Sequence, residues 1–150
     1  MKKIFRTSDS WSLLILRLTV GIVIFPHGAQ KLFGWFGGNG FMATMGFFTN
    51  KMNIPAFLAF LAIMAESLGS MGLIIGLLTR VAAFGILCNM IVAIWMVHWP
   101  NGFFMNWMGK QKGEGFEYHL LAIGICLAVM IGGGGKWSID RAIAPGPKKN

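Results

Sequence analysis

Four apolar runs follow one another along the chain, and each is close to the length that crosses a bilayer. They cover residues 11–33, 55–78, 80–99 and 116–134. A helix rises about 1.5 Å per residue, so a hydrocarbon core of about 30 Å takes about 20 apolar residues. The fourth run is the weakest, because its strongly apolar part is only "LLAIGICLAVMI". The pattern predicts an all-α membrane protein with four transmembrane helices.

The segments between the runs indicate how these helices are arranged. Only the stretch "LLTR" separates the second run from the third, so these two helices are expected to form a tight antiparallel hairpin. The other two connections, "GWFGGNGFMATMGFFTNKMN" and "WPNGFFMNWMGKQKGEGFE", are longer and rich in Gly, Trp and Phe. Such connections suit the headgroup level of a membrane, where aromatic rings settle. We expect a four-helix antiparallel bundle forming one domain over residues 1–150, without an internal repeat.

Composition supports a membrane protein. The chain is 55% hydrophobic and only 12% charged, which leaves too little polar surface to coat a soluble globule. In a soluble protein, a net charge of +8 would suggest that the partner is a nucleic acid. Here the basic residues lie between the apolar runs and not along one exposed face. We therefore expect membrane lipids, and no nucleic acid, as partners.

The basic residues also predict an orientation. Eight lie on the side of the termini (Lys2, Lys3, Arg6, Arg80, Lys136, Arg141, Lys148, Lys149) and four on the other (Lys31, Lys51, Lys110, Lys112). The positive-inside rule places the richer side in the cytoplasm. The first run is long, is interrupted by Arg17 and has no clean cleavage site after it, so it is expected to stay as an uncleaved helix. The prediction is a multi-pass protein of the bacterial inner membrane with both termini cytoplasmic.

Four polar residues fall inside or near the ends of the predicted spans, namely Arg17, His27, Glu66 and Asn89. Such groups are costly in a membrane unless they face protein or a cavity. At about 1.5 Å per residue, Arg17 lies roughly 9 Å and Glu66 roughly 14 Å from the inner surface. A long arginine side chain spans that difference. We therefore predict an ion pair between Arg17 and Glu66.

The polar residues belong to two helical faces. Residues at helical spacing on the first run are Arg17, Gly21, Ile24, Gly28 and Lys31, and on the second run Glu66, Ser70, Leu73, Leu77 and Arg80. His27 borders the first face, and Pro26 before it cannot donate to the carbonyl of Ile22, which leaves an acceptor free. We expect the two faces to meet.

These residues are candidates for a site that takes a quinone or another small apolar molecule. His27 and Lys31 would donate hydrogen bonds to a ligand carbonyl, and Glu66 would relay a proton, so Glu66 and His27 are the catalytic candidates. Arg17, Lys31, Asn89 and His119 are the expected substrate-binding residues. Structural roles remain open: a register-setting pair for Arg17 and Glu66, a carbonyl-bonded interfacial histidine for His27, and interhelical hydrogen bonding for Asn89.

A metal centre is the alternative use of the histidines. His98, Glu117 and His119 lie near the outer ends of the last two runs, at about the level of His27. Their spacings match no ligand motif, so we expect no metal. Motifs for flavin, haem and iron–sulfur clusters are also missing from the sequence, so no intrinsic cofactor is expected. Electrons would have to come from a partner protein.

Taken in order, several stretches resemble the DoxX family of small four-helix membrane proteins. They are Arg17 and Gly21, "HGAQKLFGWFGGNG", Glu66 with "GLIIGLLTR", and "GGGGKWSID", and they cover the chain from about Leu14 to Asp140. The resemblance implies an inner-membrane four-helix protein. Some family members are associated with quinone-linked oxidation, including a DoxD-like subunit of thiosulfate:quinone oxidoreductase, and others are proposed membrane partners of redox enzymes.

Three functions stay open at this point. The chain is a redox-associated subunit that binds quinone or another apolar molecule, a lipid or small-solute binding or transport module, or a scaffold for a partner enzyme. Four spans without a repeat are few for a transporter, so transport would require a homo-oligomer. Whether the protein is itself an enzyme is not determined by the sequence.

Overall fold

The computed structural model describes residues 4–144, and all regular structure there is helical. Three helical segments are long and apolar enough to cross a membrane: Trp11–Phe33, Ala56–Ile75 and Thr79–Asn101. The apolar helix Glu117–Gly132 is shorter, and its 16 residues rise only about 24 Å. The architecture is that of an apolar helical protein suited to a membrane, with one helix below the usual spanning length.

The first helix, α1 (Trp11–Phe33), has the boundaries that the apolar run predicts. Ser10 caps its start by accepting a hydrogen bond from the Leu13 N–H. Gly34 ends it in the left-handed conformation, with a φ of 73° that glycine adopts without strain. The helix continues through Pro26, so the missing donor at this residue does not break it.

The next two long helices, α3 (Ala56–Ile75) and α4 (Thr79–Ala93), form the predicted hairpin. The first of them ends three residues before the predicted boundary at residue 78. The cause is local, because Gly76 and Leu78 both have a positive φ, of 77° and 50°. The second continues as a π-helix, η2 (Ile94–His98), and a 3-10 turn, η3 (Trp99–Asn101).

Two short helical segments occupy the connection between α1 and α3, which the sequence pattern predicts to be a loop. They are α2 (Gly40–Gly46) and the π-helix η1 (Phe47–Lys51). Near the C-terminal end, α6 (Ile139–Ile143) follows the glycine-rich stretch, and Ser138 caps it by accepting from the Arg141 N–H at 3.2 Å. These segments are too short to produce a clear hydrophobic period, so the pattern does not predict them.

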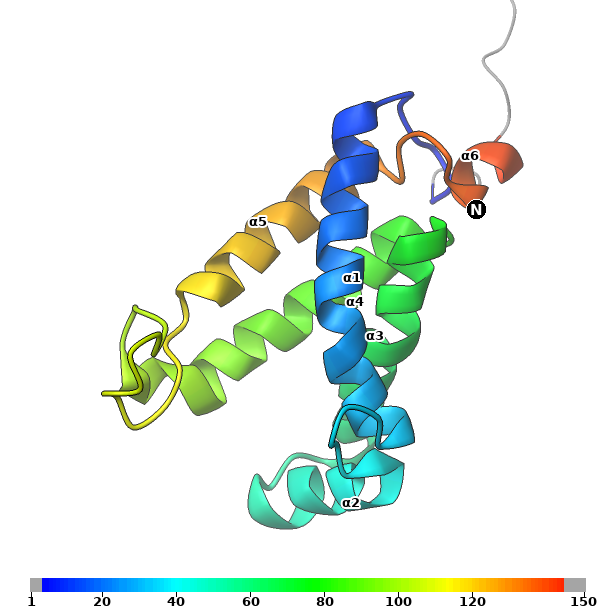
Figure 1. The fold of residues 1–150 in the computed structure, drawn as a ribbon. Coiled ribbons are helices and arrows are strands. Elements are labelled where there is room, and N and C mark those ends of the chain that lie inside the picture. Colours follow the sequence, from blue (N-terminus) through cyan, green and yellow to red (C-terminus); the bar gives the residue numbers. More distant parts are fainter. Residues whose placement is uncertain (1–3, 145–150) are drawn as a thin grey trace, which may run out of the picture.

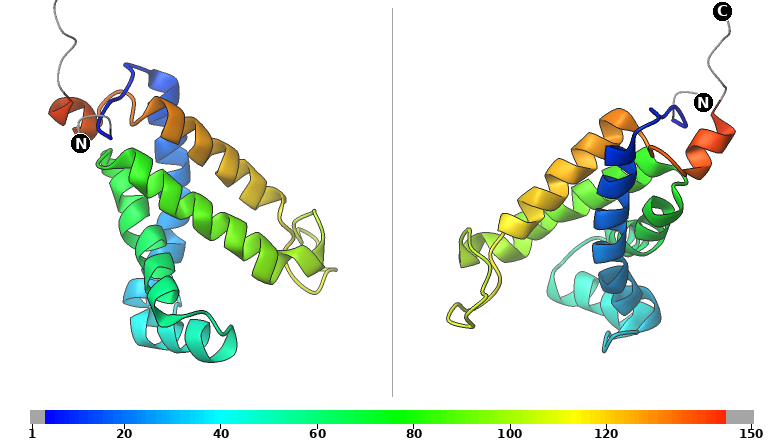
Figure 2. Two further views of the ribbon diagram at one scale, coloured as in Figure 1. Left: turned by 180° about the vertical axis from the view of Figure 1, so that it is seen from behind. Right: turned by 45° about the horizontal axis from the view of Figure 1, so that its top comes forward.

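The long helices form two antiparallel pairs (Figure 1). One pair is α1 with α3, and the other is α4 with α5 (Glu117–Gly132). Figure 2 shows from two further sides that the pairs lie together near α6 and spread apart toward α2 and the connection 102–116. The helices are therefore not one set of near-parallel rods, as the bundle prediction assumes, but two pairs that diverge.

The core lies where the two pairs come together. Its buried members come from all four long helices: Val20, Ile24, Leu73, Ala82, Ala83, Ile86, Met90, Ala122, Cys126 and Val129. Large apolar side chains also cover the outside of these helices, such as Phe57 and Leu121, each 70% exposed. An outer surface this apolar fits contact with lipid rather than with water.

Candidate functional site

The two helical faces predicted from spacing do meet, along the contact between α1 and α3. Gly28 allows the closest approach, since a Cβ at this residue would lie 2.4 Å from the Glu66 carbonyl oxygen. Ser67 binds across the same contact by donating to the Gly28 carbonyl at 3.0 Å. A Cβ at Gly21 would lie 3.1 Å from the Cβ of Leu73. Small residues thus bring the two backbones together, as is common between membrane helices.

Arg17 does not pair with Glu66, so that prediction is wrong. Its guanidinium is buried, with 1% of the residue exposed, and donates only to backbone carbonyls. Nε lies 2.7 Å from the Gly134 oxygen, Nη1 lies 2.7 Å from the oxygens of Leu73 and Ile74, and Nη2 reaches Lys136 and Trp137 at 3.3 and 2.9 Å. These acceptors include the final carbonyls of α3, which carry the negative end of the helix dipole. Arg17 therefore joins the end of α3 to the glycine-rich segment.

Asp140 completes this end of the molecule. Its carboxylate accepts from the N–H groups of Leu78 and Thr79 at 2.7 and 2.8 Å and from the Thr79 hydroxyl at 2.6 Å. An acceptor with negative charge at the first turn of α4 caps that helix and complements its dipole. The sequence stretch "GGGGKWSID" thus has a structural function here.

A cavity of about 530 Å³ lies between the two helix pairs. Most of its wall is apolar and comes from α1, η1, α3, α4 and η2, and its polar lining residues are His27, Lys31, Glu66, Asn89, His98, Glu114, Tyr118 and His119. Several lining residues are exposed, among them Val23, Val92 and Val97 at 42%, 44% and 45%, so the cavity is open and not enclosed. Five of the six predicted site residues line it, and Arg17 does not.

Glu66 is the centre of a polar cluster on the cavity wall. One carboxylate oxygen forms an ion pair with the Lys31 ammonium, and the other lies 3.4 Å from the Asn89 amide nitrogen. Asn89 also donates to the Ala62 carbonyl at 2.7 Å, and Lys31 reaches the His27 carbonyl at 3.5 Å. Three helices supply these groups. A carboxylate has about four acceptor positions, so Glu66 can still accept from a ligand.

The histidines form a second polar group in the same cavity. The rings of His98 and His119 have centroids 4.1 Å apart, and His98 Nδ1 lies 2.8 Å from the Glu114 carbonyl oxygen. Sequence spacing predicts His119 and His27 as ligand-site residues, whereas His98 is only a candidate for the metal alternative and Tyr118 is not predicted. His98 lies in the π-helical turn Ile94–His98, and Tyr118 lies in the first turn of α5. The sequence feature that could have identified His98 is its predicted depth, because His98 and His119 lie at a similar level near the ends of neighbouring helices.

No group of three or more His, Cys, Asp or Glu residues is placed to hold a metal within residues 4–144.

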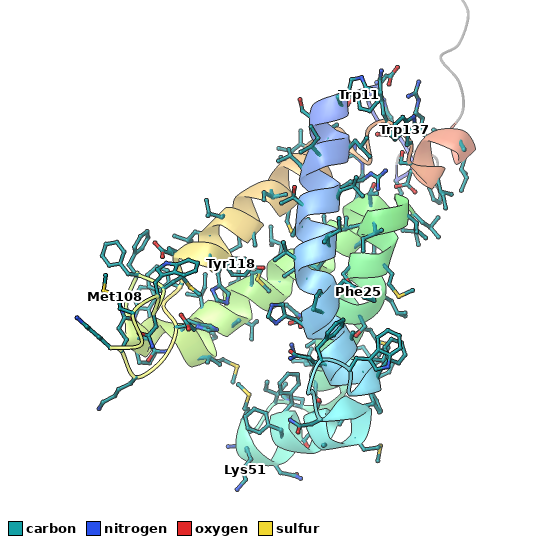
Figure 3. All side chains as sticks on the ribbon, viewed as in Figure 1. Trp11, Phe25, Lys51, Met108, Tyr118 and Trp137 are labelled. Atoms are coloured by element: carbon teal, nitrogen blue, oxygen red, sulfur yellow. The ribbon has the colours of Figure 1, made fainter. Side chains whose placement is uncertain are left out.

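The ends of the molecule carry aromatic and basic side chains. Figure 3 shows Trp11 and Trp137 together near α6, with Met108 and Lys51 at the far ends of the two helix pairs. The Trp11 and Trp137 rings pack edge to face with centroids 5.0 Å apart. Such rings are enriched at membrane interfaces.

Comparison with known proteins agrees with the resemblance found in the sequence. The DoxX family model matches residues 12–99. A relative from Bacillus subtilis (strain 168), named "Putative oxidoreductase CatD", is 31% identical over 116 residues, which cover 77% of this chain and 76% of that protein. No solved structure matches the chain. The matched span and the coverage of the relative establish that this chain belongs to the DoxX family.

Proposed function

We propose that the protein is a redox-associated subunit of the bacterial inner membrane that binds a quinone or another small apolar molecule in the cavity between its helix pairs. The observation that carries this proposal is the mostly apolar cavity of about 530 Å³ with an ionisable cluster, Lys31 and Glu66, on its wall. Pockets for small ligands usually measure about 300–1,000 Å³ and combine apolar walls with a few polar groups. Ionisable groups at membrane depth generally serve function.

Each polar residue of the cavity would have a different role in binding a ligand ring that carries carbonyl groups. Lys31 has three N–H donors, and His27 adds one more, for a ligand carbonyl. Glu66 would take or give the proton that accompanies reduction or oxidation, with Asn89 holding its second oxygen in place. His119 would contact the ligand from α5. For Arg17 we propose a structural function, since its donors all bind backbone carbonyls.

A partner protein would supply or remove the electrons. The sequence has no motif for an intrinsic electron carrier. The relative from Bacillus subtilis is named "Putative oxidoreductase CatD", which supports a redox setting. This division of labour assigns binding and proton handling to the chain and electron transfer to its partner.

The membrane arrangement that goes with this function has four spans and both termini in the cytoplasm. The fourth span would be α5 extended by Phe116 and by residues 133–135, which adds the length that the helix lacks. The open side of the cavity, at Val23 and Val92, would then face lipid. An apolar ligand could enter from the bilayer by this route.

The same opening favours a lipid or small apolar solute as the second candidate ligand. Met52, Met90, Met96 and Met105 line the cavity, and flexible thioether side chains adapt to chains of varied shape. In this alternative the protein binds or moves the lipid, and transport would require several copies in a homo-oligomer. A scaffold for a partner enzyme, with no ligand, is the third case.

The test is to extract the protein gently with its native lipids and identify bound molecules by mass spectrometry. Co-purified quinone supports the proposal, and a phospholipid alone in the cavity supports the second candidate. Glu66→Gln and His27→Ala are then compared with the wild type in cells that depend on the gene. Lost activity at normal membrane abundance supports a ligand site. If both variants keep their activity and added quinone causes no thermal shift, the result supports the scaffold function, in which the protein binds no ligand.

A further inference from the structure

His119 lines the cavity, and within residues 4–144 neither of its ring nitrogens has a hydrogen bond to the protein. The residue is only 7% exposed and lines the cavity from α5. Its Nδ1 is buried and is the one buried side-chain nitrogen or oxygen within residues 4–144 that has no hydrogen-bond partner. Leaving such an atom unpaired is unfavourable. Because Nδ1 is buried while Nε2 is not, a ligand in the cavity would bind the ring at Nε2.

His98 beside it is held in one orientation. Its Nδ1 lies 2.8 Å from the Glu114 carbonyl oxygen, and because a carbonyl only accepts, this nitrogen carries the proton. The neutral ring then has a lone pair on Nε2. The ring packs on His119 with centroids 4.1 Å apart, so the two imidazoles form one polar surface on the cavity wall.

The chemistry of this pair selects a hydroxyl group. A neutral His119 has one nitrogen that donates and one that accepts, and a hydroxyl can serve either of them because it both donates and accepts. A carbonyl or an ether oxygen only accepts, so it cannot satisfy the lone pair of His98 Nε2. The neighbouring wall is aromatic: the Tyr118 ring stands edge to face on His119 at 5.5 Å, and Phe47 and Phe48 line the cavity too. Aromatic walls favour a flat ring.

We propose that His98 and His119 bind an aromatic hydroxyl group, so that the cavity takes the quinol form of a quinone, or another phenol, in preference to the fully oxidised ring. This inference rests on the proposed function and adds to it the oxidation state of the ligand and the residues that recognise it. The pair binds and orients the hydroxyl. It is separate from the Lys31–Glu66 ion pair, which lies on α1 and α3.

The experiment uses the full chain in lipid nanodiscs without oxygen. Three probes are compared by quenching of tryptophan fluorescence: a benzoquinol with a decyl tail, the matching quinone, and the dimethyl ether of the quinol, which has the same ring but no hydroxyl. We expect the quinol to bind at least about tenfold more tightly than the ether and the quinone, because only the quinol satisfies both imidazoles.

Three variants identify the residues responsible. His119→Phe should remove the preference for the quinol, whereas His119→Gln, which still has a donor and an acceptor, should keep most of it. Tyr118→Phe is the matched control, since it removes a neighbouring hydroxyl from the same wall and should leave the preference unchanged. Thermal unfolding of each variant checks that the fold is intact.

The possible failures are distinguishable. If all three probes bind equally, or if His119→Phe keeps the preference, the hydroxyl site is wrong while quinone binding stands. A preference abolished by Tyr118→Phe alone would assign recognition to the tyrosine and would also overturn the inference. If none of the probes binds, the proposed function fails, and this inference fails with it.

Discussion

Lys31 of α1 and Glu66 of α3 form an ion pair on the wall of the cavity, although they lie 35 residues apart in the chain. Their side chains are 25% and 12% exposed, so the pair is largely shielded from solvent. Depth along the helices predicts Arg17 as the partner of Glu66. Lys31 lies on the same face of α1 and takes that place, because Arg17 binds the carbonyls at the end of α3 instead.

The Lys31–Glu66 pair should contribute to stability as a coupled unit. Lys31→Met leaves a shielded carboxylate without its cation, and Glu66→Gln leaves a shielded ammonium without its anion. We expect each single variant to be less stable than the wild type, and the double variant to recover part of the loss. The coupling free energy should be about 0.5–3 kcal/mol, measured by unfolding in mixed detergent micelles with increasing sodium dodecyl sulfate. Strictly additive effects would show that the two charges do not interact.

Arg17 should be essential for folding and not for ligand affinity. Arg17→Met leaves several buried carbonyls at the end of α3 and in residues 134–137 without donors, so we expect a loss of at least about 3 kcal/mol in the same unfolding assay. Arg17→Lys should rescue little, because an ammonium cannot reproduce the planar guanidinium fork.

The control for Arg17 is Arg141, which is exposed and pairs with Asp9 at 2.6 Å. Exposed pairs contribute only about 0–1 kcal/mol, so Arg141→Met should change stability little. A stable Arg17→Met protein that had lost its ligand would contradict the structural role and would return Arg17 to the binding site.

Gly28 should not tolerate even a methyl group. A Cβ there would lie 2.4 Å from the Glu66 carbonyl oxygen, so Gly28→Ala forces α1 away from α3 and displaces Glu66. We expect a marked loss of thermal stability and of ligand binding together. Gly124→Ala is the matched control, because a Cβ at that residue of α5 has nothing within 4 Å, and it should leave stability unchanged or slightly improved. Equal effects of the two substitutions would contradict the close contact of α1 with α3.

The proposed orientation can be tested by labelling. Exposed residues at opposite ends of the molecule, Lys51, Lys110 and Arg141, are replaced singly by cysteine in a background with Cys88→Ala and Cys126→Ala. A membrane-impermeant maleimide added to spheroplasts should label Lys51→Cys and Lys110→Cys and leave Arg141→Cys unmodified until the membrane is opened. The reverse pattern would place the termini outside, and labelling of Lys51→Cys without Lys110→Cys would mean an odd number of spans between them.

Part of the site follows from spacing alone. Arg17, Gly21, Gly28 and Lys31 repeat at helical intervals, so their common face on α1 could be predicted, and with it the contact to the face of Glu66. His27 and Asn89 could be singled out because polar groups in apolar helices need a protein or cavity partner. The sequence could not predict which cation pairs with Glu66, because Arg17 and Lys31 lie on the same face of the helix. Only the position of the glycine-rich segment determines what Arg17 binds.

The role of Asp140, near the end of the described residues, could also be found only in the tertiary structure. Asp140 is separated from the N–H groups of Leu78 and Thr79 by about 60 residues, and the sequence carries no local sign that it caps α4. His98 lies in the π-helical turn that follows α4 and packs against His119 of α5, and the sequence pattern at Ile94–His98 is that of an ordinary apolar helix.

By itself, the sequence determined that this is an apolar helical protein with a known family resemblance, where its long helices begin, and which polar residues must avoid lipid. Those properties depend on hydrophobic runs and helical period, which are local. The tertiary structure decided that the helices form two diverging pairs, that a cavity lies between them, and that Lys31, and not Arg17, neutralises Glu66. These depend on which carbonyls and side chains come within bonding distance after packing, and residues far apart in the chain determine that.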